Sequence, residues 1–169
     1  MQHQEKKYRV ASFEDIERVL NELNLQPSKP QSSTNYYALS TGLSVTKLVV
    51  DDSACAIHVL DEDHGKFNMR ENIPVKNLEA GLQWLRDHGF DAVNIVHMNH
   101  TDYEYNNGVI GLYTINDSLK SVILDYPAGS HEDIEHELGL TTAETITVPY
   151  NIYLQQQGQL KITNLEELN

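Results

Sequence analysis

The sequence predicts an α+β domain of about eight strands, mostly joined as hairpins, that form an antiparallel sheet or barrel. Many short segments are apolar or alternate between apolar and polar residues, as strands do. Turn signals separate them, including the acidic, glycine-ended loop 61–65 and the Asn-Gly step at 107–108. Only a few segments have apolar residues at helical spacing, so helices are expected to be the minor component.

In chain order, strands are expected at residues 3–10, 34–39, 45–50, 54–60, 66–73, 91–100, 103–105, 109–113 and 122–126, followed by a last extended region at 145–154. The Pro- and Ser-rich segment 26–33 is expected to be a loop. Helices are expected from Ser12, a capping residue, over about three turns, from about 77 to 88 with Gly89 as the stop, and over 130–139.

Composition and charge limit the classes of function. At 169 residues the chain is expected to be a single domain over 1–169, with a peripheral tail from about residue 155. Residues 1–90 carry a net charge of -3 and residues 91–169 a net charge of -10, within a total of -13. This balance argues against nucleic acid as a partner, and any anionic ligand must be held by the first half.

The remaining composition favours a cytoplasmic protein. No apolar run approaches the roughly 20 residues needed to span a bilayer, and the polar N-terminus does not resemble a secretory signal. The one cysteine, Cys55, cannot form an intramolecular disulfide, which suits a reducing compartment. We therefore expect no membrane contact.

The first strand carries the most informative pattern. Side chains alternate between the two faces of a strand, so His3, Glu5, Lys7 and Arg9 share one face. Ionisable side chains on one face indicate a polar interior. Alternatively, Lys7 and Arg9 are edge-strand charges that discourage aggregation. Two later histidines, His97 and His100, point to opposite faces of a strand and are expected to be hydrogen-bonded side chains, not ligands of one ion.

The order of elements over roughly residues 3–154 resembles that of the CYTH superfamily, which comprises class IV adenylyl cyclases, thiamine triphosphatases and other triphosphate tunnel metalloenzymes. The family opens with E-x-E-x-K, and this chain has His3-x-Glu5-x-Lys7. Further similar segments are Tyr8-Arg9-Val10 with Phe13-Glu14-Asp15-Ile16, Thr34-Asn35-Tyr36-Tyr37, Trp84 to Phe90, Glu135 to Leu140, and the Tyr150 region. The resemblance implies a tunnel-like antiparallel barrel of about eight strands with helices packed outside.

The resemblance also implies how such a tunnel works. Inward Lys and Arg hold a triphosphate of about four negative charges, and opposing carboxylates hold Mg²⁺ or Mn²⁺. This chain lacks much of that equipment. Lys47 to Asp51 stands where the family has an arginine pair, Val96 to His100 where it has lysine and arginine, and Ile123 to Tyr126 where it has a late E-x-E, which leaves Asp125.

Six residues remain as the candidate site. Lys7 is the catalytic candidate, and Arg9, Lys66 and Arg70 are candidates for substrate binding. Glu5 and Asp125 are the candidate metal ligands, for Mg²⁺ or Mn²⁺ if the protein is catalytic.

Three hypotheses follow. The first is a barrel that has lost most of its polyphosphate-binding residues and binds a small, phosphorylated ligand or a protein without turnover. The second is a metal-dependent triphosphate or nucleotide phosphohydrolase, or an adenylyl cyclase, with a reduced active site. The third is a solid barrel filled by Val49, Met98 and Ile123 that presents a protein-interaction surface. A homodimer is compatible with all three.

Overall fold

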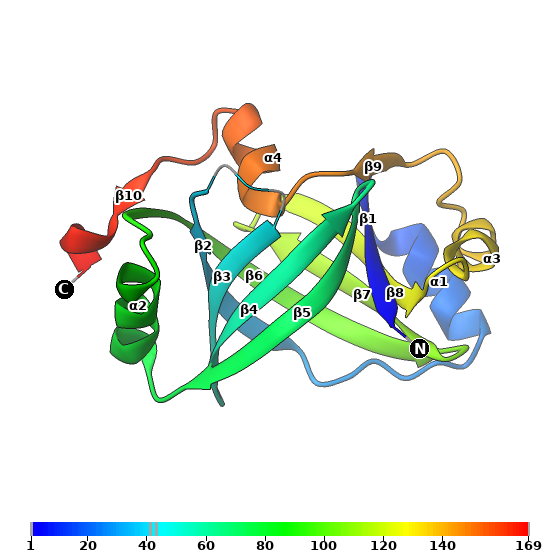
Figure 1. Ribbon diagram of the computed structural model, residues 1–169. Coiled ribbons are helices and arrows are strands. Elements are labelled where there is room, and N and C mark those ends of the chain that lie inside the picture. The colour runs from blue at the N-terminus through cyan, green and yellow to red at the C-terminus, as the bar shows by residue number, and fades with distance from the viewer. Residues whose placement is uncertain (1, 41, 43, 169) are drawn as a thin grey trace. The chain divides into compact units, whose positions relative to one another are not determined.

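The fold was analysed in a computed structural model that describes residues 2–40, 42 and 44–168. Figure 1 shows its strands and helices. The strands are β1 His3–Val10, β2 Gln31–Ala38, β3 Ser44–Asp51, β4 Cys55–Asp63, β5 Lys66–Val75, β6 Ala92–Tyr105, β7 Gly108–Ile115, β8 Leu119–Pro127, β9 Glu144–Ile146 and β10 Thr163–Asn164. The helices are α1 Glu14–Glu22, α2 Leu78–Asp87, α3 His131–Glu137, α4 Tyr150–Gln156 and the 3₁₀-helix η1 Leu165–Leu168.

The strand pairings close on themselves. Hydrogen-bonded neighbours follow the order β6, β2, β3, β4, β5, β1, β8, β7, and β7 pairs in turn with β6. The short strands β9 and β10 are added to β1 and β6. The predicted α+β fold, an antiparallel β-barrel of eight strands with helices outside, is therefore confirmed.

Contacts between Cα atoms group the chain into two compact units. Unit 1 comprises residues 1–31, 63–68 and 99–147, and unit 2 comprises residues 32–62, 69–98 and 148–169. The strands β2, β4, β5 and β6 contribute residues to both units, β2 and β4 by one end residue each.

The core of unit 1 lies on one face of β1 and β8. Tyr8, at the centre of β1, is 1% exposed and lies opposite Val122 in the antiparallel register. The apolar stripe of α1, with Ile16 and Leu20, packs on this face, and so does α3 through Ile134 and Leu138. Burial of these side chains fixes which face of β1 is apolar. The alternate residues Glu5, Lys7 and Arg9 therefore lie on the other face.

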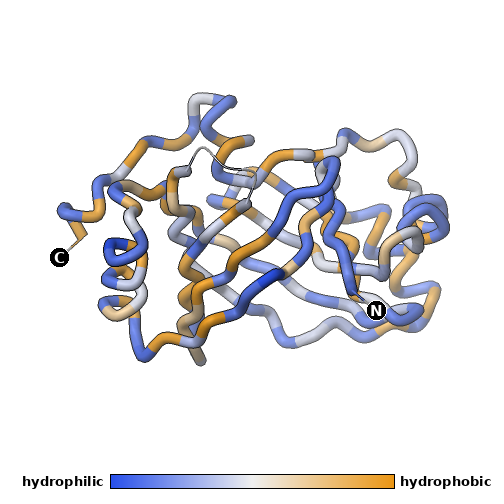
Figure 2. The backbone as a smooth tube through the Cα atoms, in the orientation of Figure 1, coloured by the Kyte–Doolittle hydropathy of each residue, from blue (hydrophilic) through white to orange (hydrophobic). Residues whose placement is uncertain are grey.

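The core of unit 2 lies between α2 and the strands β3 and β4. Leu82 and Leu85 of α2 pack with Leu48 and Ile57, all of them buried. Figure 2 shows hydrophobic segments on the strands next to α2. The helix begins as predicted, because the Asn77 side chain accepts a hydrogen bond of 2.9 Å from the Ala80 backbone nitrogen.

Three expectations about elements are wrong. Residues 31–33, expected in a loop, begin β2, where Ser33 pairs with Asp51 of β3. Residues 92–105 form one strand of 14 residues instead of two. The expected extended region 145–154 contains the short strand β9 and then helix α4, whose Tyr150, Tyr153 and Leu154 are buried at helical spacing.

Among residues 2–40, 42 and 44–168, no helix is long and apolar enough to cross a membrane.

Candidate functional site

The polar face of unit 1 is built by the inward alternation of β1 and β8. Glu5 lies directly opposite Asp125, Lys7 opposite Ile123, and Arg9 opposite Ser121. Directly opposed residues of antiparallel strands project to the same side. We call this surface, with the β6 and β7 side chains described below, the polar face. It is the face opposite Tyr8 and the hydrophobic core of unit 1.

Lys7 is the most buried charged residue of this face, at 4% exposure. Its Nζ lies 4.3 Å from the ring centroid of Phe67, within the range of a cation–π interaction. Its cross-strand neighbours, Ile123 on β8 and Ile146 on β9, are both buried. The aliphatic stem of Lys7 thus packs among apolar side chains while an aromatic ring faces its charge.

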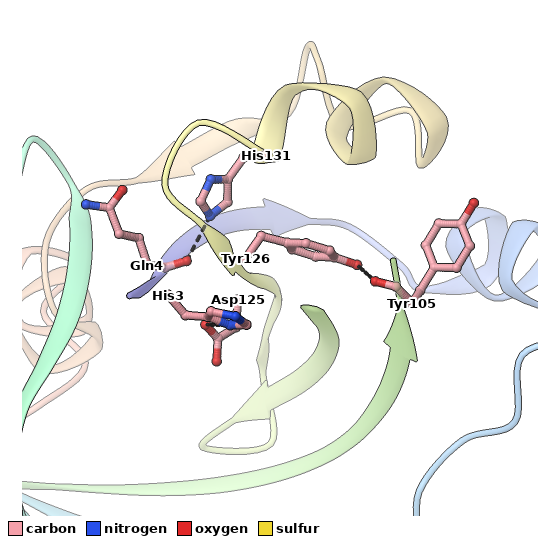
Figure 3. Close-up of polar contacts among 6 residues, drawn as sticks. All are labelled: His3, Gln4, Tyr105, Asp125, Tyr126 and His131. Carbon is pink, nitrogen blue, oxygen red and sulfur yellow. Dashed lines mark hydrogen bonds and ion pairs between the residues drawn. The ribbon is translucent and has the colours of Figure 1, made fainter. Parts of the chain in front are cut away.

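Glu5 and Asp125 put two carboxylates next to each other. Asp125 Oδ1 also lies 3.4 Å from His3 Nδ1. Burial raises the pKa of Asp125, while the charge of His3 and a hydrogen bond from it partly offset this rise. Figure 3 shows the His3 and Asp125 side chains side by side.

Two residues of β6, which the sequence did not suggest, extend the polar face. His100 stacks on Tyr113 of β7, with ring centroids 4.4 Å apart, and its Nε2 lies 3.6 Å from Asp102 Oδ2. Burial raises the pKa of Asp102, His100 lowers it, and the negative charge of Asp125 raises it again. The carboxylates of Asp102 and Asp125 therefore repel each other when both are ionised. Together they give the polar face an acidic character.

The three remaining candidate residues do not lie beside Glu5, Lys7 and Asp125. Arg9 Nη1 lies 3.8 Å from Glu144 Oε2, and both side chains are at least half exposed. Lys66 precedes Phe67, so strand alternation directs Lys66 away from the face that Phe67 shares with Glu5. Arg70 belongs to unit 2, where its Nε lies 3.4 Å from Asp61 Oδ1. The structure thus brings Glu5, Lys7 and Asp125 together, with Arg9 farther along β1.

A hydrogen bond to a buried histidine anchors β1 beside this site. His131, the first residue of α3, is buried, and its Nε2 lies 2.8 Å from the backbone oxygen of Gln4. The Tyr126 hydroxyl donates to the backbone oxygen of Tyr105 at 2.7 Å (Figure 3). These contacts tie β1, β6, β8 and α3 together and hold the strands that carry Glu5 and Asp125.

The described residues supply two carboxylates but no larger group of metal ligands. Across the described part of the chain, no group of three His, Cys, Asp or Glu side chains is arranged to hold a metal ion. Glu5 and Asp125 could supply two oxygen ligands, and a bound Mg²⁺ commonly takes its remaining ligands from water and from the phosphate of a substrate.

Unit 2 has a second row of polar side chains that the sequence did not single out as a site. Tyr37, Lys47 and His58 lie side by side on β2, β3 and β4, and Lys47 is opposite both neighbours in the register. Lys47 Nζ lies 5.2 Å from the ring centroid of Tyr37. Burial and, as a smaller cause, the charge of Lys47 lower the pKa of His58 to about 4, against the opposing effect of Asp51. We call Tyr37, Lys47 and His58 the cross-strand row.

A sequence signal for this row existed. Lys47 is the one Lys or Arg between Lys29 and Lys66, and it interrupts the mainly apolar segment 45–50. His58 likewise interrupts the mainly apolar segment 54–60, the next expected strand. The sequence alone does not determine the strand register that places Lys47 and His58 side by side.

The closed ring of strands is an eight-stranded antiparallel barrel, which is the fold that the sequence resemblance implied. The chain is similar to the PH1012 protein of Pyrococcus horikoshii OT3, with a TM-score of 0.75 and 18% identity over 88% of this chain and 97% of that one. It is also similar to a candidate adenylate cyclase from Bacillus halodurans, with a TM-score of 0.63 and 14% identity over 90% and 95% of the two chains.

A third similar structure is a candidate adenylyl cyclase from Hippeastrum described as having a dominant triphosphatase activity. Its TM-score is 0.61, with 11% identity over 94% of this chain and 97% of that one. No family model and no curated protein matches the sequence. At these identities the likeness establishes the fold.

Proposed function

We propose that this protein is a non-catalytic binding module that uses a CYTH-like barrel to hold a small anionic ligand. The observation that carries the proposal is the environment of Lys7. Its ammonium faces the ring of Phe67, and two acidic residues with raised pKa values, Asp102 and Asp125, lie on the same face. A polyanion brought to this face would meet carboxylates as well as Lys7.

The other cations support the same proposal. Arg9 is within ion-pair distance of Glu144, and Arg70 of Asp61. A triphosphate of about four negative charges is stabilised by several converging cations in a site of low dielectric constant. Residues 91–169 contribute a net charge of -10 and only Lys120 and Lys161 as cations. A ligand with fewer charges suits this chain better.

The test is phosphate release from ATP, thiamine triphosphate and tripolyphosphate in the presence of Mg²⁺ or Mn²⁺. We expect wild-type release to equal that of the buffer blank, and Lys7→Ala to make no difference. Metal-dependent release that Lys7→Ala abolishes would overturn the proposal. A thermal-shift panel with the same compounds and with phosphate adds a binding readout, because a ligand that binds only the folded state raises its stability.

A second candidate function is a metal-dependent triphosphate or nucleotide phosphohydrolase, or an adenylyl cyclase, with a reduced active site. The observation that favours it is the cross-strand pair of Glu5 and Asp125, two carboxylates on one face next to Lys7. In this reading the two carboxylates would supply two oxygen ligands to Mg²⁺ or Mn²⁺, and Lys7 and Arg9 would contact phosphate; Lys66 and Arg70, proposed for this role from the sequence, lie away from the pair. The triphosphatase activity described for the Hippeastrum protein suggests which substrates to try first.

The two candidates differ in their response to metal. For the phosphohydrolase, Mn²⁺ should raise the melting temperature, and Glu5→Gln with Asp125→Asn should abolish the rise. For the binding module, Mn²⁺ should leave the melting temperature of the wild-type protein unchanged.

Other expectations belong to the same proposal. We place the protein in the cytoplasm, since its one cysteine, Cys55, is a free thiol. A protein partner and a homodimer remain compatible with it, and burial of Met98 and Ile123 favours a well-packed barrel that presents its outside to such partners. Nucleic acid does not suit a net charge of -13.

A further inference from the structure

Unit 1 has a pocket of about 330 Å³ beside helix α1. Its apolar walls are Phe13, which precedes α1, Pro27 and Pro30 of the loop between α1 and β2, Tyr103 of β6 and Leu112 of β7. Phe13, Tyr103 and Leu112 belong to the hydrophobic core of unit 1, so the pocket adjoins that core and not the polar face. Its volume lies within the range of small-molecule sites, about 300–1,000 Å³.

Two hydrogen bonds hold the loop wall of this pocket against β6. The Ser28 backbone nitrogen donates to the Asp102 backbone oxygen at 2.8 Å, and the Asp102 backbone nitrogen donates to Ser28 Oγ at 2.9 Å. Figure 1 shows the loop running along β6. Pro27 and Pro30, on either side of Ser28, have a fixed φ. The pocket is therefore formed in the free protein, and little conformational entropy is lost when a ligand enters it.

Tyr103 brings an unpartnered hydroxyl to this pocket. The residue is only 7% exposed, and within residues 2–40, 42 and 44–168 its hydroxyl neither donates nor accepts a hydrogen bond. Burial and, as a smaller cause, the charge of Glu17 raise the pKa of Tyr103, so the hydroxyl stays neutral next to a carboxylate. Buried polar groups are normally hydrogen-bonded, and a ligand atom in the pocket would supply the missing partner.

Glu17 supplies a negative charge at the same pocket. It lies one helical turn after Phe13, whose backbone oxygen accepts a hydrogen bond of 2.8 Å from the Glu17 backbone nitrogen, so the two side chains share one face. Glu17 forms no ion pair with a Lys or Arg of the described residues. It is also the only Asp, Glu, Lys or Arg among the described residues that line the pocket. The one histidine of the lining, His100, stacks on Tyr113 and lies beside Asp102.

The surroundings of the pocket are acidic as well. Helix α1 carries four carboxylates and one arginine, a net charge of -3. A groove of about 710 Å³ along α1 shares Phe13 and Glu17 with the pocket. The other charged residues that line this groove are Glu14, Arg18, Glu22 and Lys120. With Glu17, the groove thus has three carboxylates against two cations, and this balance favours a cationic ligand.

We propose that this pocket binds a guanidinium group, carried either by a free small molecule or by an arginine of a peptide. Glu17 would accept two parallel N–H groups of the planar cation, the Tyr103 hydroxyl would accept a further N–H, and the Phe13 and Tyr103 rings would face the guanidinium plane. An ammonium suits the pocket less, because it is more strongly hydrated and has no plane to stack on a ring. The site goes beyond the proposed function and is independent of it, since no residue of the pair Glu5 and Asp125 lines it.

The experiment is an NMR titration of the backbone amide signals of the full chain with butylguanidine at constant ionic strength. We expect the signals of Thr101, Tyr103 and Thr114, which line the pocket, to shift and to saturate at millimolar concentrations. Butylurea has the same shape without the charge and should bind about tenfold more weakly. Butylamine should also bind more weakly than butylguanidine. The absence of saturating shifts, or equal binding of butylurea or butylamine, would overturn the site.

Three variants test the residues of the pocket. Glu17→Gln keeps the shape of an exposed side chain and should weaken butylguanidine binding about tenfold. Tyr103→Phe keeps the ring and should weaken binding about two- to tenfold. Glu104→Gln is the matched control, because it removes the same charge from an exposed position next to Tyr103 that alternation directs to the other face of β6. It should bind as the wild type does.

The variants also separate a defined site from a general attraction to an acidic protein. Equal losses in Glu17→Gln and Glu104→Gln would show that net charge alone draws the cation, and the site would be refuted. Thermal unfolding of each variant verifies that it is folded. If Tyr103→Phe does not fold, the comparison of Glu17→Gln with Glu104→Gln decides the question, because both positions are exposed.

A peptide separates the two sources of the guanidinium group. Acetyl-Gly-Arg-Gly-amide that binds at least as tightly as butylguanidine would support a protein ligand, and its contacts should also shift the amide signals of Glu14 and Glu22 in the groove. Binding of butylguanidine with exclusion of the peptide would support a free small molecule. Failure of both compounds to bind would overturn the inference and leave the proposed function of the barrel untouched.

Discussion

Glu5 of β1 and Asp125 of β8 lie directly opposite each other in the antiparallel register, on the face away from the buried core of unit 1. Two carboxylates in such a pair repel each other when both are ionised. Asp125 also acts on a third carboxylate, that of Asp102, because the negative charge of Asp125 raises the pKa of Asp102. Ionisation of all these carboxylates therefore places like charges near one another and lowers the stability of the folded protein.

The first prediction is that Asp125→Asn stabilises the protein at pH 8. Asp125 has a folded pKa above its unfolded value, so its ionisation costs stability at high pH, and the cost disappears as pH falls towards the unfolded pKa. Its side chain is 39% exposed, and solvent screening reduces the gain to about 0.5 kcal/mol. Urea unfolding at pH 8 and pH 5 should show a larger difference between variant and wild type at pH 8.

Asp117→Asn is the control for this prediction, because it removes the same charge from an exposed turn position with a φ of 57° that asparagine accepts. It should leave the stability of the protein unchanged at both pH values. A variant Asp125→Asn that is less stable than wild type at pH 8 would mean that the ion pair with His3 outweighs the cost of burying the charge of Asp125.

The second prediction concerns Lys7 as a packing residue. Lys7→Met keeps the length of the stem and removes the charge, so the free energy of unfolding should change by less than about 1.5 kcal/mol. Lys7→Ala also removes the buried aliphatic stem that carries the ammonium to the Phe67 ring, and it should cost about 2 kcal/mol. Urea unfolding measures both values. Equal losses in the two variants would indicate that the charge of Lys7, and not its packing, stabilises the barrel.

Alternation predicts the shared face of Glu5, Lys7 and Arg9, because the side-chain period of a strand is a local property. The partners of these residues are not local. Asp125 lies 120 positions from Glu5, and their contact depends on the pairing of β1 with β8. The pairings of Lys47 with His58 and Tyr37 likewise depend on register, which the apolar pattern alone leaves open.

Helix α4 shows why one element escaped prediction. Residues 145–154 are rich in β-branched and aromatic residues, which favour strands locally. In the structure, Pro149 precedes the helix, and Tyr150, Tyr153 and Leu154 bury one face of it. Tertiary burial thus overrides local propensity in a helix of seven residues, which could not form alone.

The third prediction is the tautomer of His131. The backbone oxygen of Gln4 can only accept a hydrogen bond, so His131 Nε2 must carry the hydrogen. The Nδ1 atom is buried and has no hydrogen-bond partner in the structure. Nitrogen chemical shifts should therefore identify Nε2 as the ring nitrogen that carries the hydrogen bonded to Gln4. His131→Leu leaves the Gln4 oxygen unsatisfied and should cost about 1–3 kcal/mol, measured by urea unfolding.

A hydrogen on Nδ1 and none on Nε2, or an averaged tautomer signal, would show that the contact with Gln4 is not maintained in solution. His136 of the same helix gives the reference signal, since it is exposed.

The fourth prediction concerns the buried asparagine pair that ties α4 to β6. Asn151 Nδ2 donates to Asn94 Oδ1 at 3.1 Å, and Asn94 Nδ2 donates to the backbone oxygen of Lys161 at 2.9 Å. Asn94 is fully buried, so Asn151→Ala leaves its Oδ1 without a donor in a site of low dielectric constant. The loss of stability should be about 1–3 kcal/mol in urea unfolding.

Gln155→Ala, an exposed position of the same helix, is the matched control and should change stability by less than about 0.5 kcal/mol. The double variant Asn94→Ala/Asn151→Ala should cost less than the sum of the two single variants, since neither amide is then left unpaired by the other. Additive losses would show that the two asparagines stabilise unit 2 independently. In that case α4 would be held by its apolar contacts, Tyr150, Tyr153 and Leu154, and not by the hydrogen bond to β6.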